Sequence, residues 1–561
     1  MNKKVLISFT ILFLTSTVFL ITFSVPARAS FDLTVHNIDS GLSYSMIQDA
    51  IDAPETLDRH TIFVEEGTYY ENIFVHKNIS LVGEKRETTI IDGKETGSVI
   101  VLAFNAEANI TRFTIRNSGF MNSGVQVCYL NNNISDNILI DNYYGIRLYS
   151  RVRDSVVSGN TVSNNMYGIY LEYPTENNTI HSNIVSDNKY GIYLTWTNKN
   201  TLFNNSMTNN AYNFFVWGGF DNFVDRSNRV DGKQVYYVRN ETGTLYDSSD
   251  NAGILYLINC NNVTVRDLTL TKNGIGVMLW NTNNTKIENV TALNNMFGFW
   301  LIYSNNNTIS GNTVSNSTFG LYFHTSCYYN NVFGNTIVNN KKGITICPDS
   351  SNNFFHHNNF VDNAEQLSIY LPSFTLNVWD NGLEGNYWSD YAGVDLNHDG
   401  IGDSEYEINT YSIDNYPLMG IFHSFNTSLG YCVNVITNST IEESEYFESN
   451  NTIRLYVSNL TASQTYGFCR VCIPSALTNV TEISVVIDDG FTEILYPNYD
   501  VYDNGTHRWI YFAYEYSKHK IDIIPELLSF LILPIFIIAT LLTTITYKIT
   551  ISCNRRTRSS L

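Results

Sequence analysis

Residues 154–173 read DSVVSGNTVSNNMYGIYLEY, and the phrase that ends this stretch returns along much of the chain. It recurs as DNKYGIYL at 187–194, NNMFGFWL at 294–301 and NSTFGLYF at 316–323. Its glycine keeps a step of 22 or 23 residues within two series, namely Gly145, Gly168 and Gly191, then Gly276, Gly298, Gly320 and Gly343. Such a period predicts a repeat architecture, in which each unit buries its apolar side chains only by stacking on its neighbours.

Each unit has the composition of strands and sharp turns. Short runs of Val, Ile, Thr and Tyr are separated by Asn, Gly and Ser, and no stretch of ten residues has helical spacing. In GIYL, Ile169 and Leu171 lie on one face of a strand and Tyr170 on the other. Three short strands per unit predict an all-β fold, a right-handed parallel β-helix of the pectin-lyase-like kind.

The composition excludes one class of function. The formal net charge is −20, so nothing basic is available to follow a phosphate backbone, and we expect no nucleic-acid partner.

The N-terminal 29 residues have the layout of an export signal. An apolar run from Val5 to Phe23 follows two lysines and precedes Ala27-Arg28-Ala29, which predicts cleavage before Ser30, with an uncleaved anchor as the alternative. Residues 43–53 then show helical spacing with Ser45 as N-cap. We expect this short helix to cover the open end of the solenoid.

The repeat is interrupted between residues 218 and 261. Asn213 holds the glycine position in the unit before the interruption. Gly276 lies 63 residues beyond it, which is two units plus about 17 residues. We interpret the excess as a side excursion from one edge of a single solenoid that occupies residues 30–425.

The C-terminal part changes character. Longer alternating strands at irregular spacing predict an immunoglobulin-like β-sandwich over 426–525. Residues 527–547 are uncharged and long enough to span a bilayer as one transmembrane helix. The basic segment 548–561 predicts a cytoplasmic tail, so the large N-terminal part faces outward from a single-pass membrane anchor.

An acidic loop follows the last repeat. Oxygen ligands alternate around Gly400 in the order of a calcium-binding loop, with candidate ligands Asp395, Asn397, Asp399, Ile401 and Asp403. The fit is partial because position 12 is Tyr406, and the alternative is an Asp/Gly-rich turn with solvated carboxylates. Calcium is the one cofactor that we predict.

Aromatic side chains stand beside the inner positions on coil after coil. The candidate ligand-binding ladder is Tyr170, Tyr193, Phe215, Trp300 and Tyr322. A row of exposed rings binds sugar faces, which predicts glycans or envelope polymers as partners. The alternative is that the rings stack on one another and stabilise the coils.

The acids do not concentrate into a catalytic set. Asp141, Asp187 and Asp362 share one turn position, but Asn164 and Asn209 replace the acid in other coils. We therefore assign no catalytic residue. A polysaccharide lyase or glycoside hydrolase acting on the face of the β-helix is the alternative to a binding or structural envelope protein.

Asn-x-Ser/Thr sequons recur along the chain and fit an exported glycoprotein. The candidate glycosylation sites are Asn78, Asn109, Asn289, Asn316, Asn479 and Asn504.

The repeats with NNTI, SGN and YGIYL, the opening SMIQDAIDA and the closing GNYWSDYAGVDLNHDGIGD resemble the NosD-like family. The resemblance covers about residues 32–420. It implies a parallel β-helix, shared with carbohydrate-binding and sugar-hydrolysing (CASH-type) domains, and it implies as a second alternative an accessory role in copper-site maturation. GFCRVCIP and IPELLSF resemble the tails of archaeal surface-anchored members.

Overall fold

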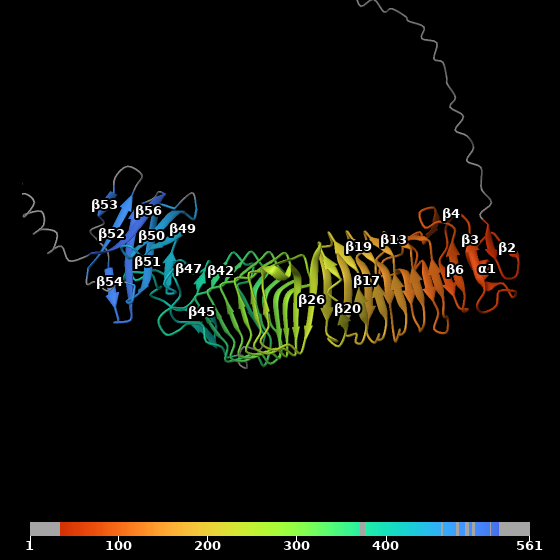
Figure 1. Cartoon of the computed structure of the whole chain (residues 1–561), viewed down its shortest axis with the longest axis horizontal. Helices are drawn as coiled ribbons and strands as arrows, with labels where there is room; N and C mark the ends of the chain where they lie inside the picture. Colours follow the sequence, from red (N-terminus) through yellow and green to blue (C-terminus); the bar gives the residue numbers. More distant parts are fainter. Residues whose placement is uncertain are drawn as a thin grey trace, which may run out of the picture.

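The computed structural model describes residues 34–370, 376–461, 464–477, 482–488, 493–495, 500–515 and 518–526. They form a long β-helix followed by two antiparallel sheets (Figure 1). The predicted signal at 1–29, the predicted membrane span at 527–547 and the tail at 548–561 lie outside these residues. Within the described ranges, no helix is long and apolar enough to cross a membrane.

Three short strands make each coil, as the repeat predicts. One coil consists of β12 (Asn133–Ser135), β13 (Ile138–Ile140) and β14 (Tyr144–Leu148). The next consists of β15 (Val156–Ser158), β16 (Thr161–Ser163) and β17 (Tyr167–Glu172), and each strand pairs in parallel with its counterpart one coil away. Ile146 pairs with Ile169 and Ile169 with Ile192, and this inner column is buried. The predicted β-helix is confirmed.

The glycine of the repeated phrase is required by close packing between coils. A Cβ placed on Gly168 would lie 2.6 Å from the carbonyl oxygen of Gly191 and 2.7 Å from Cγ1 of Val185. No side chain fits there, so the glycine recurs wherever the coil makes this approach.

Buried asparagines connect the coils through their side chains. Asn183 Nδ2 donates to Asn205 Oδ1 at 2.9 Å and to the carbonyl oxygen of Val157 at 2.9 Å. Its own Oδ1 accepts from Asn160 Nδ2 at 3.0 Å. Such a ladder satisfies the corner backbone groups that a sheet leaves unpaired.

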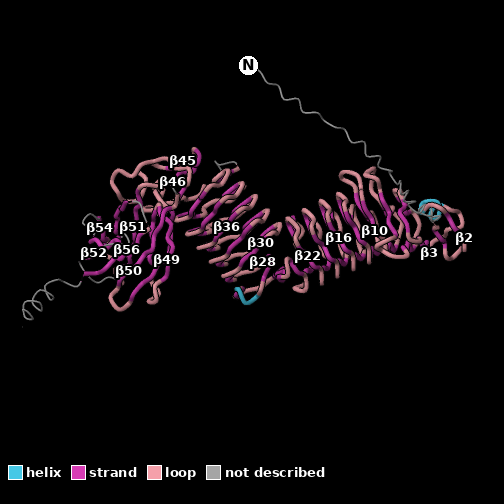
Figure 2. Tube along the Cα trace, turned by 90° about the horizontal axis from the view of Figure 1, so that it is seen from above, coloured by secondary structure: helices cyan, strands magenta, loops and turns pink. Residues whose placement is uncertain are grey.

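The solenoid consists of two blocks, and the predicted side excursion is wrong. The last partial coil of the first block ends at β25 (Arg229–Val230), which pairs in parallel with β22 (Ser206–Thr208). A tight hairpin then reverses the chain into β26 (Lys233–Arg239), which runs antiparallel to β25 and starts the second block. The interruption is therefore the joint itself, and Figure 2 shows the two blocks meeting at an angle.

At the joint, the second block is turned relative to the first. The sheet that contains the middle strands of the first block, such as β22, continues into β26, β28 (Ala252–Ile258), β31 (Ile275–Trp280) and β34 (Phe297–Ile302). Of these strands, β31 and β34 carry the glycine phrase, whose first-block counterparts lie in another sheet.

Strands of the second block near the joint are buried on both faces. Leu257, Leu279 and Leu301 belong to the core of the second block. The alternate residues Met278 and Trp300 pack in the hydrophobic cluster of the first block. The end of the first block thus covers the outer face of this sheet.

The predicted N-terminal helix is confirmed, but its predicted N-cap residue is not. α1 (Ile47–Asp52) buries Ile47 and Ile51 over the first coil, while Met46 is exposed. The predicted Ser45 cap is wrong, because the carboxylate of Glu71 accepts from the backbone N–H groups of Ile47 and Gln48 at 2.9 Å each. This carboxylate belongs to the first coil and so ties the helix to it.

Two five-stranded antiparallel sheets follow the solenoid. One contains β47 (Ile421–Asn426), β48 (Cys432–Thr437), β51 (Tyr466–Pro474), β54 (Asp500–Asp503) and β55 (His507–Glu515). The other contains β49 (Ser439–Phe447), β50 (Thr452–Asn459), β52 (Glu482–Asp488), β53 (Glu493–Leu495) and β56 (His519–Glu526). Val435 and Val471 of the first sheet share one hydrophobic cluster with Leu455 and Ile521 of the second. Because β47 belongs to this unit, the predicted boundary at 425 lies too late by about one strand; immunoglobulin-like connectivity stays a prediction.

Candidate functional site

A pocket of about 420 Å³ opens where the two solenoid blocks meet. Trp196, Trp217 and Phe220 line it from the first block. Trp280, Trp300, Ile302, Tyr303 and His324 line it from the second, and Asn198, Gly218, Gly219 and Asp221 complete the wall. The chain has seven tryptophans, and four of them gather at this one place.

The joint positions these rings. Trp217 ends β23 (Tyr212–Trp217), and its ring centroid lies 4.9 Å from that of Trp300 in β34, 83 residues further along the chain. Phe220 lies 5.3 Å from Trp280 in the same way. Both contacts join the first block to the second, so the pocket exists only because the blocks abut. Sites between packed units are a common location for ligand pockets.

Trp196 stands at the mouth of the pocket and is 56% exposed. Its backbone is left-handed, with φ of 53°. The indole lies on the backbone of Gly218, where a Cβ would come within 2.6 Å of Trp196 Cε3. Gly218 itself has φ of +73°, a conformation that favours glycine. The dipeptide Gly218-Gly219 therefore makes room for an accessible flat ring.

One tryptophan of the pocket wall has a buried indole N–H. Trp300 is only 3% exposed, and its indole N–H has no hydrogen-bond partner in the described structure. A buried donor without an acceptor costs about 1–3 kcal/mol. Nearby, burial lowers the pKa of His324, so this imidazole is neutral at pH 7. The pocket lining is thus mainly apolar, with the carboxylate of Asp221 at its wall.

The predicted aromatic ladder is not a continuous exposed row. Its rings stack on one another, with centroids 5.2 Å apart between Tyr170 and Tyr193 and 4.9 Å apart between Tyr193 and Phe215. Phe215 is 1% exposed, and Tyr170, Tyr193 and Tyr322 are half-buried. The expectation of exposure is wrong for Phe215 and Trp300, because the second block covers Phe215 and the end of the first block covers Trp300. Of the five, Trp300 alone lines the pocket.

The repeat pattern does not single out Trp196, Trp217 and Trp280. They do not share one repeat position, and periodicity therefore gave no weight to them. The available signal was their rarity together with the Trp-Gly-Gly motif at 217–219, which lies at the interruption of the repeat.

A second cleft, of about 830 Å³, lies between the end of the solenoid and the first C-terminal sheet. His356, His357, His423 and Cys432 line it together with Asp267 and Glu288, among others. His356 and His357 do not point apart as adjacent strand residues would. His357 has a left-handed φ of 58°, so the two Nδ1 atoms lie 3.2 Å apart.

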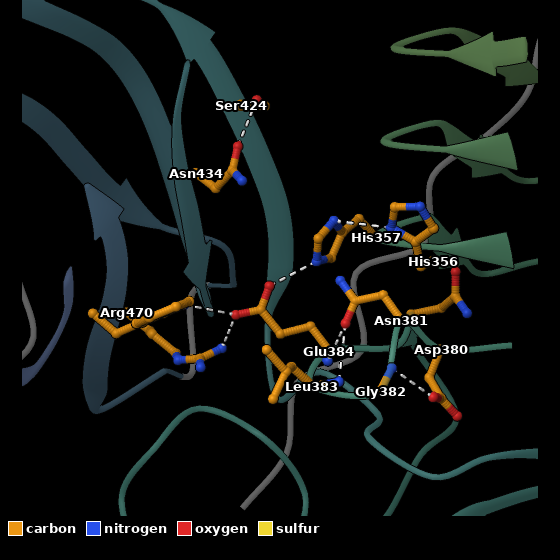
Figure 3. Close-up of polar contacts among 12 residues, drawn as sticks. His356, His357, Asp380, Asn381, Gly382, Leu383, Glu384, Ser424, Asn434 and Arg470 are labelled. Carbon is orange, nitrogen blue, oxygen red and sulfur yellow. Dashed lines mark hydrogen bonds and ion pairs between the residues drawn. The ribbon is translucent and has the colours of Figure 1, made fainter. Parts of the chain in front are cut away.

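Glu384 links His357 of this cleft to the C-terminal sheet. Its carboxylate accepts from His357 Nε2 at 2.7 Å and from Trp509 Nε1 at 3.0 Å, and it pairs with Arg470 (Figure 3). Burial alone would raise the pKa of Glu384, but the hydrogen bond from His357 and the positive charge of Arg470 outweigh it and lower the pKa to about 2.

The acidic loop packs against the C-terminal sheet. Asp395 accepts from the backbone N–H groups of Asp399 and Gly400 at 3.0 and 2.9 Å, and Asp403 accepts from Leu396 at 2.6 Å. The carboxylates thus serve the turn itself. In the described part of the chain, no group of three or more His, Cys, Asp or Glu side chains is placed to hold a metal ion.

The predicted glycosylation sites differ in access. Asn289, Asn316 and Asn504 are exposed, whereas Asn78 and Asn109 are half-buried. The side-chain oxygens of these last two accept hydrogen bonds from Glu107 N and Asn133 Nδ2 at 2.8 Å each. Asn479 lies outside the described residues.

The family model described as periplasmic copper-binding protein (NosD) matches residues 55–229 and 221–393, more than half of the chain. The probable ABC transporter binding protein NosD of Stutzerimonas stutzeri is 44% identical over 86 residues, 14% of this chain and 19% of that protein. A cell surface glycoprotein of Methanothermus fervidus is 29% identical over 125 residues, 20% of this chain and 19% of that protein.

The matches to these curated relatives span about a fifth of their length. Among solved structures, the A-module of the mannuronan C-5 epimerase AlgE4 of Azotobacter vinelandii is similar at 15% identity and a TM-score of 0.31. That match covers 60% of this chain and 96% of the epimerase module. With the coils of the solenoid and the family match over 55–393, the chain belongs to the NosD family of parallel β-helix proteins.

Proposed function

We propose that this chain is an envelope protein that binds carbohydrate in the tryptophan-lined pocket at the joint of its two blocks. The observation that carries the proposal is the convergence of Trp196, Trp217, Trp280 and Trp300 on one pocket with an accessible ring at its mouth. The C–H face of a sugar ring binds to flat aromatic faces, and its hydroxyl groups accept hydrogen bonds. The accessible ring of Trp196 supplies such an aromatic face.

The names of the relatives support an extracellular or envelope location. One relative is a cell surface glycoprotein, and the family description is periplasmic. Export by the N-terminal signal and anchoring by residues 527–547 with the tail inside complete the proposal. Surface exposure would bring the pocket into contact with envelope glycans.

Catalysis is a weaker candidate than binding. The tryptophan pocket contains a single carboxylate, that of Asp221, and this carboxylate is paired with Arg239 at 2.6 Å. A glycosidase needs two carboxyl groups in defined roles. The pocket therefore supports recognition of a sugar rather than cleavage.

Copper, which the family description names, does not fit the described residues. The cleft with His356 and His357 is the best candidate, but His357 Nε2 is taken by Glu384, and Cys432 Sγ lies 2.7 Å from Ser424 Oγ. No set of three suitable ligands converges in the described ranges. An accessory role in copper-site maturation is therefore not the function that this geometry supports best.

The experiment is a glycan array probed with the purified full chain. We expect binding that Trp196→Ala weakens by about tenfold, a loss of about 1.4 kcal/mol, and that Trp196→Phe partly retains. Tyr329→Ala is the control, because Tyr329 is comparably exposed on the solenoid but lies outside the pocket. Silence of the wild-type chain across all glycans would reject the proposal.

A further inference from the structure

The tryptophan pocket is one end of a longer groove. A neighbouring pocket of about 330 Å³ is lined by Arg151, Arg153, Tyr173, Pro174, Thr175 and Glu176, and it shares Trp196 and Asn198 with the tryptophan pocket. Trp196 therefore stands between two connected depressions, one cationic and one aromatic.

The groove runs along the axis of the solenoid. Arg153 bridges in parallel to Glu176 and Glu176 to Asn198, so these residues occupy one column on successive coils. The next coil adds Asp221, whose backbone N–H donates to Asn198 Oδ1 at 3.2 Å. Successive coils are about 4.8 Å apart, a rise comparable to one sugar unit of an extended chain.

Basic side chains that do not line the groove neutralise its two acidic residues. Glu176 lies 3.6 Å from Lys199, and Asp221 pairs with Arg239 at 2.6 Å. Arg153 also lies 3.6 Å from the carboxylate of Glu176. Arg151 is exposed and has no ion-pair partner among the described residues. In a chain of net charge −20, this end of the groove is a local positive site.

We infer that the groove binds a linear acidic polysaccharide along the solenoid axis. This rests on the proposed carbohydrate binding and adds the charge and direction of the ligand. An anionic group of the chain binds Arg151 and Arg153, whose planar guanidinium groups match carboxylate or sulfate oxygens in pairs. The next sugar rings lie on Trp196 and enter the tryptophan pocket. A short saccharide would occupy only one of the two depressions.

Calorimetry on the purified full chain tests this with three hexasaccharides. One carries a carboxylate on each unit, the second is its carboxyl-reduced neutral counterpart, and the third is a sulfated analogue. We expect at least one acidic hexasaccharide to bind about tenfold more tightly than the neutral one at low salt, with the gap closing in 0.5 M salt on the order expected from screening. The two acidic arms show which anion is recognised.

The double variant Arg151→Gln/Arg153→Gln should remove the preference for acidic saccharides and leave the affinity for the neutral one unchanged. Trp196→Ala should weaken all arms alike. Arg59→Gln is the control, since Arg59 is exposed near the N-terminal end of the solenoid, away from the groove. Equal affinity for acidic and neutral hexasaccharides would overturn this inference while leaving the proposed function intact. No binding in any arm would also overturn this inference, whereas the glycan array decides the proposed function.

Discussion

Glu384, near the end of the solenoid, and Arg470, on strand β51 of the C-terminal sheet, form an ion pair that crosses the boundary between the two units. Both side chains are largely buried, and Trp509 of the same sheet donates a second hydrogen bond to the carboxylate. Figure 3 shows the carboxylate between the C-terminal sheet and the two histidines of the solenoid. A buried, paired charge of this kind holds the C-terminal unit in one orientation.

Removing that charge should loosen the attachment of the C-terminal sheets. Breaking a buried pair from one side costs about 3–5 kcal/mol, because the partner is left uncompensated. We expect Glu384→Gln to lower the urea midpoint of the full chain and to raise hydrogen exchange in β51. Asp503→Asn breaks the more exposed Asp503–Arg508 pair and should change either quantity little. Equal effects of the two substitutions would contradict this role.

The same carboxylate predicts an acid-sensitive interface. The pKa of Glu384 is lowered in the folded chain from 4.5 to about 2. Its contribution to stability is therefore present above pH 4.5 and is lost as the pH falls from about 4.5 to 2, by about 3 kcal/mol in all. Urea midpoints measured from pH 7 to 2.5 should fall less steeply in Glu384→Gln than in the wild type. Parallel curves of midpoint against pH for the two proteins would show that other titrating groups dominate the loss of stability in acid.

Substitution of Asn183, in the middle of the asparagine ladder, should lower the stability of the chain. Asn183→Ala removes the acceptor of both Asn160 Nδ2 and the backbone N–H of Asn160 in a fully buried corner. Each orphaned group costs about 1–3 kcal/mol, so we expect a loss of about 3–5 kcal/mol in the free energy of unfolding. Ser186→Ala, on the same coil but only half-buried, should cost far less.

Gly218→Ala should disturb the tryptophan pocket without disturbing the fold. The added Cβ would meet the indole of Trp196 at 2.6 Å, and φ of +73° strains any non-glycine residue. We expect the ring to be displaced and glycan affinity to fall by about as much as in Trp196→Ala, roughly tenfold, with an unchanged circular dichroism spectrum. The comparison is Gly232→Ala, also at positive φ but with no atom within 4 Å of the new Cβ. Unaltered binding in Gly218→Ala would exclude a role for the position of Trp196.

The calcium site stays a prediction. Asp395, Asn397 and Asp399 follow the spacing of a calcium loop, but their oxygens accept from neighbouring N–H groups in the structure. Calorimetric titration of the full chain with calcium should give a binding heat that Asp399→Ala abolishes. A titration unchanged by this substitution would assign the loop to a plain Asp/Gly turn.

The coil was predictable because its determinants are local. Ile169, Leu171 and Gly168 each face the same neighbour in every coil, so one repeated phrase specifies strands, inner columns and corners. The covering helix was predictable for the same reason. Its cap was not, since Glu71 lies 24 residues from Ile47 and reaches it only through the fold.

The joint was not predictable from the repeat. The phrase around Gly298 reads like the phrase around Gly168, yet the two lie in different sheets, because the hairpin at β25 and β26 turns the second block. A repeated phrase specifies a position within a coil and says nothing about how one stack of coils is placed on another. The pocket depends on that placement, so the sequence pointed to the buried rings of the ladder and missed Trp196.

The strands that are covered on both faces make the bend between the blocks stiff. Opening it would expose Met278, Trp300 and their neighbours to water, so we expect the angle to vary little in the native state. With a fixed angle between the blocks, a surface that holds one end of the solenoid also fixes the height and direction of the other end. Two such molecules side by side would hold their joints at the same level.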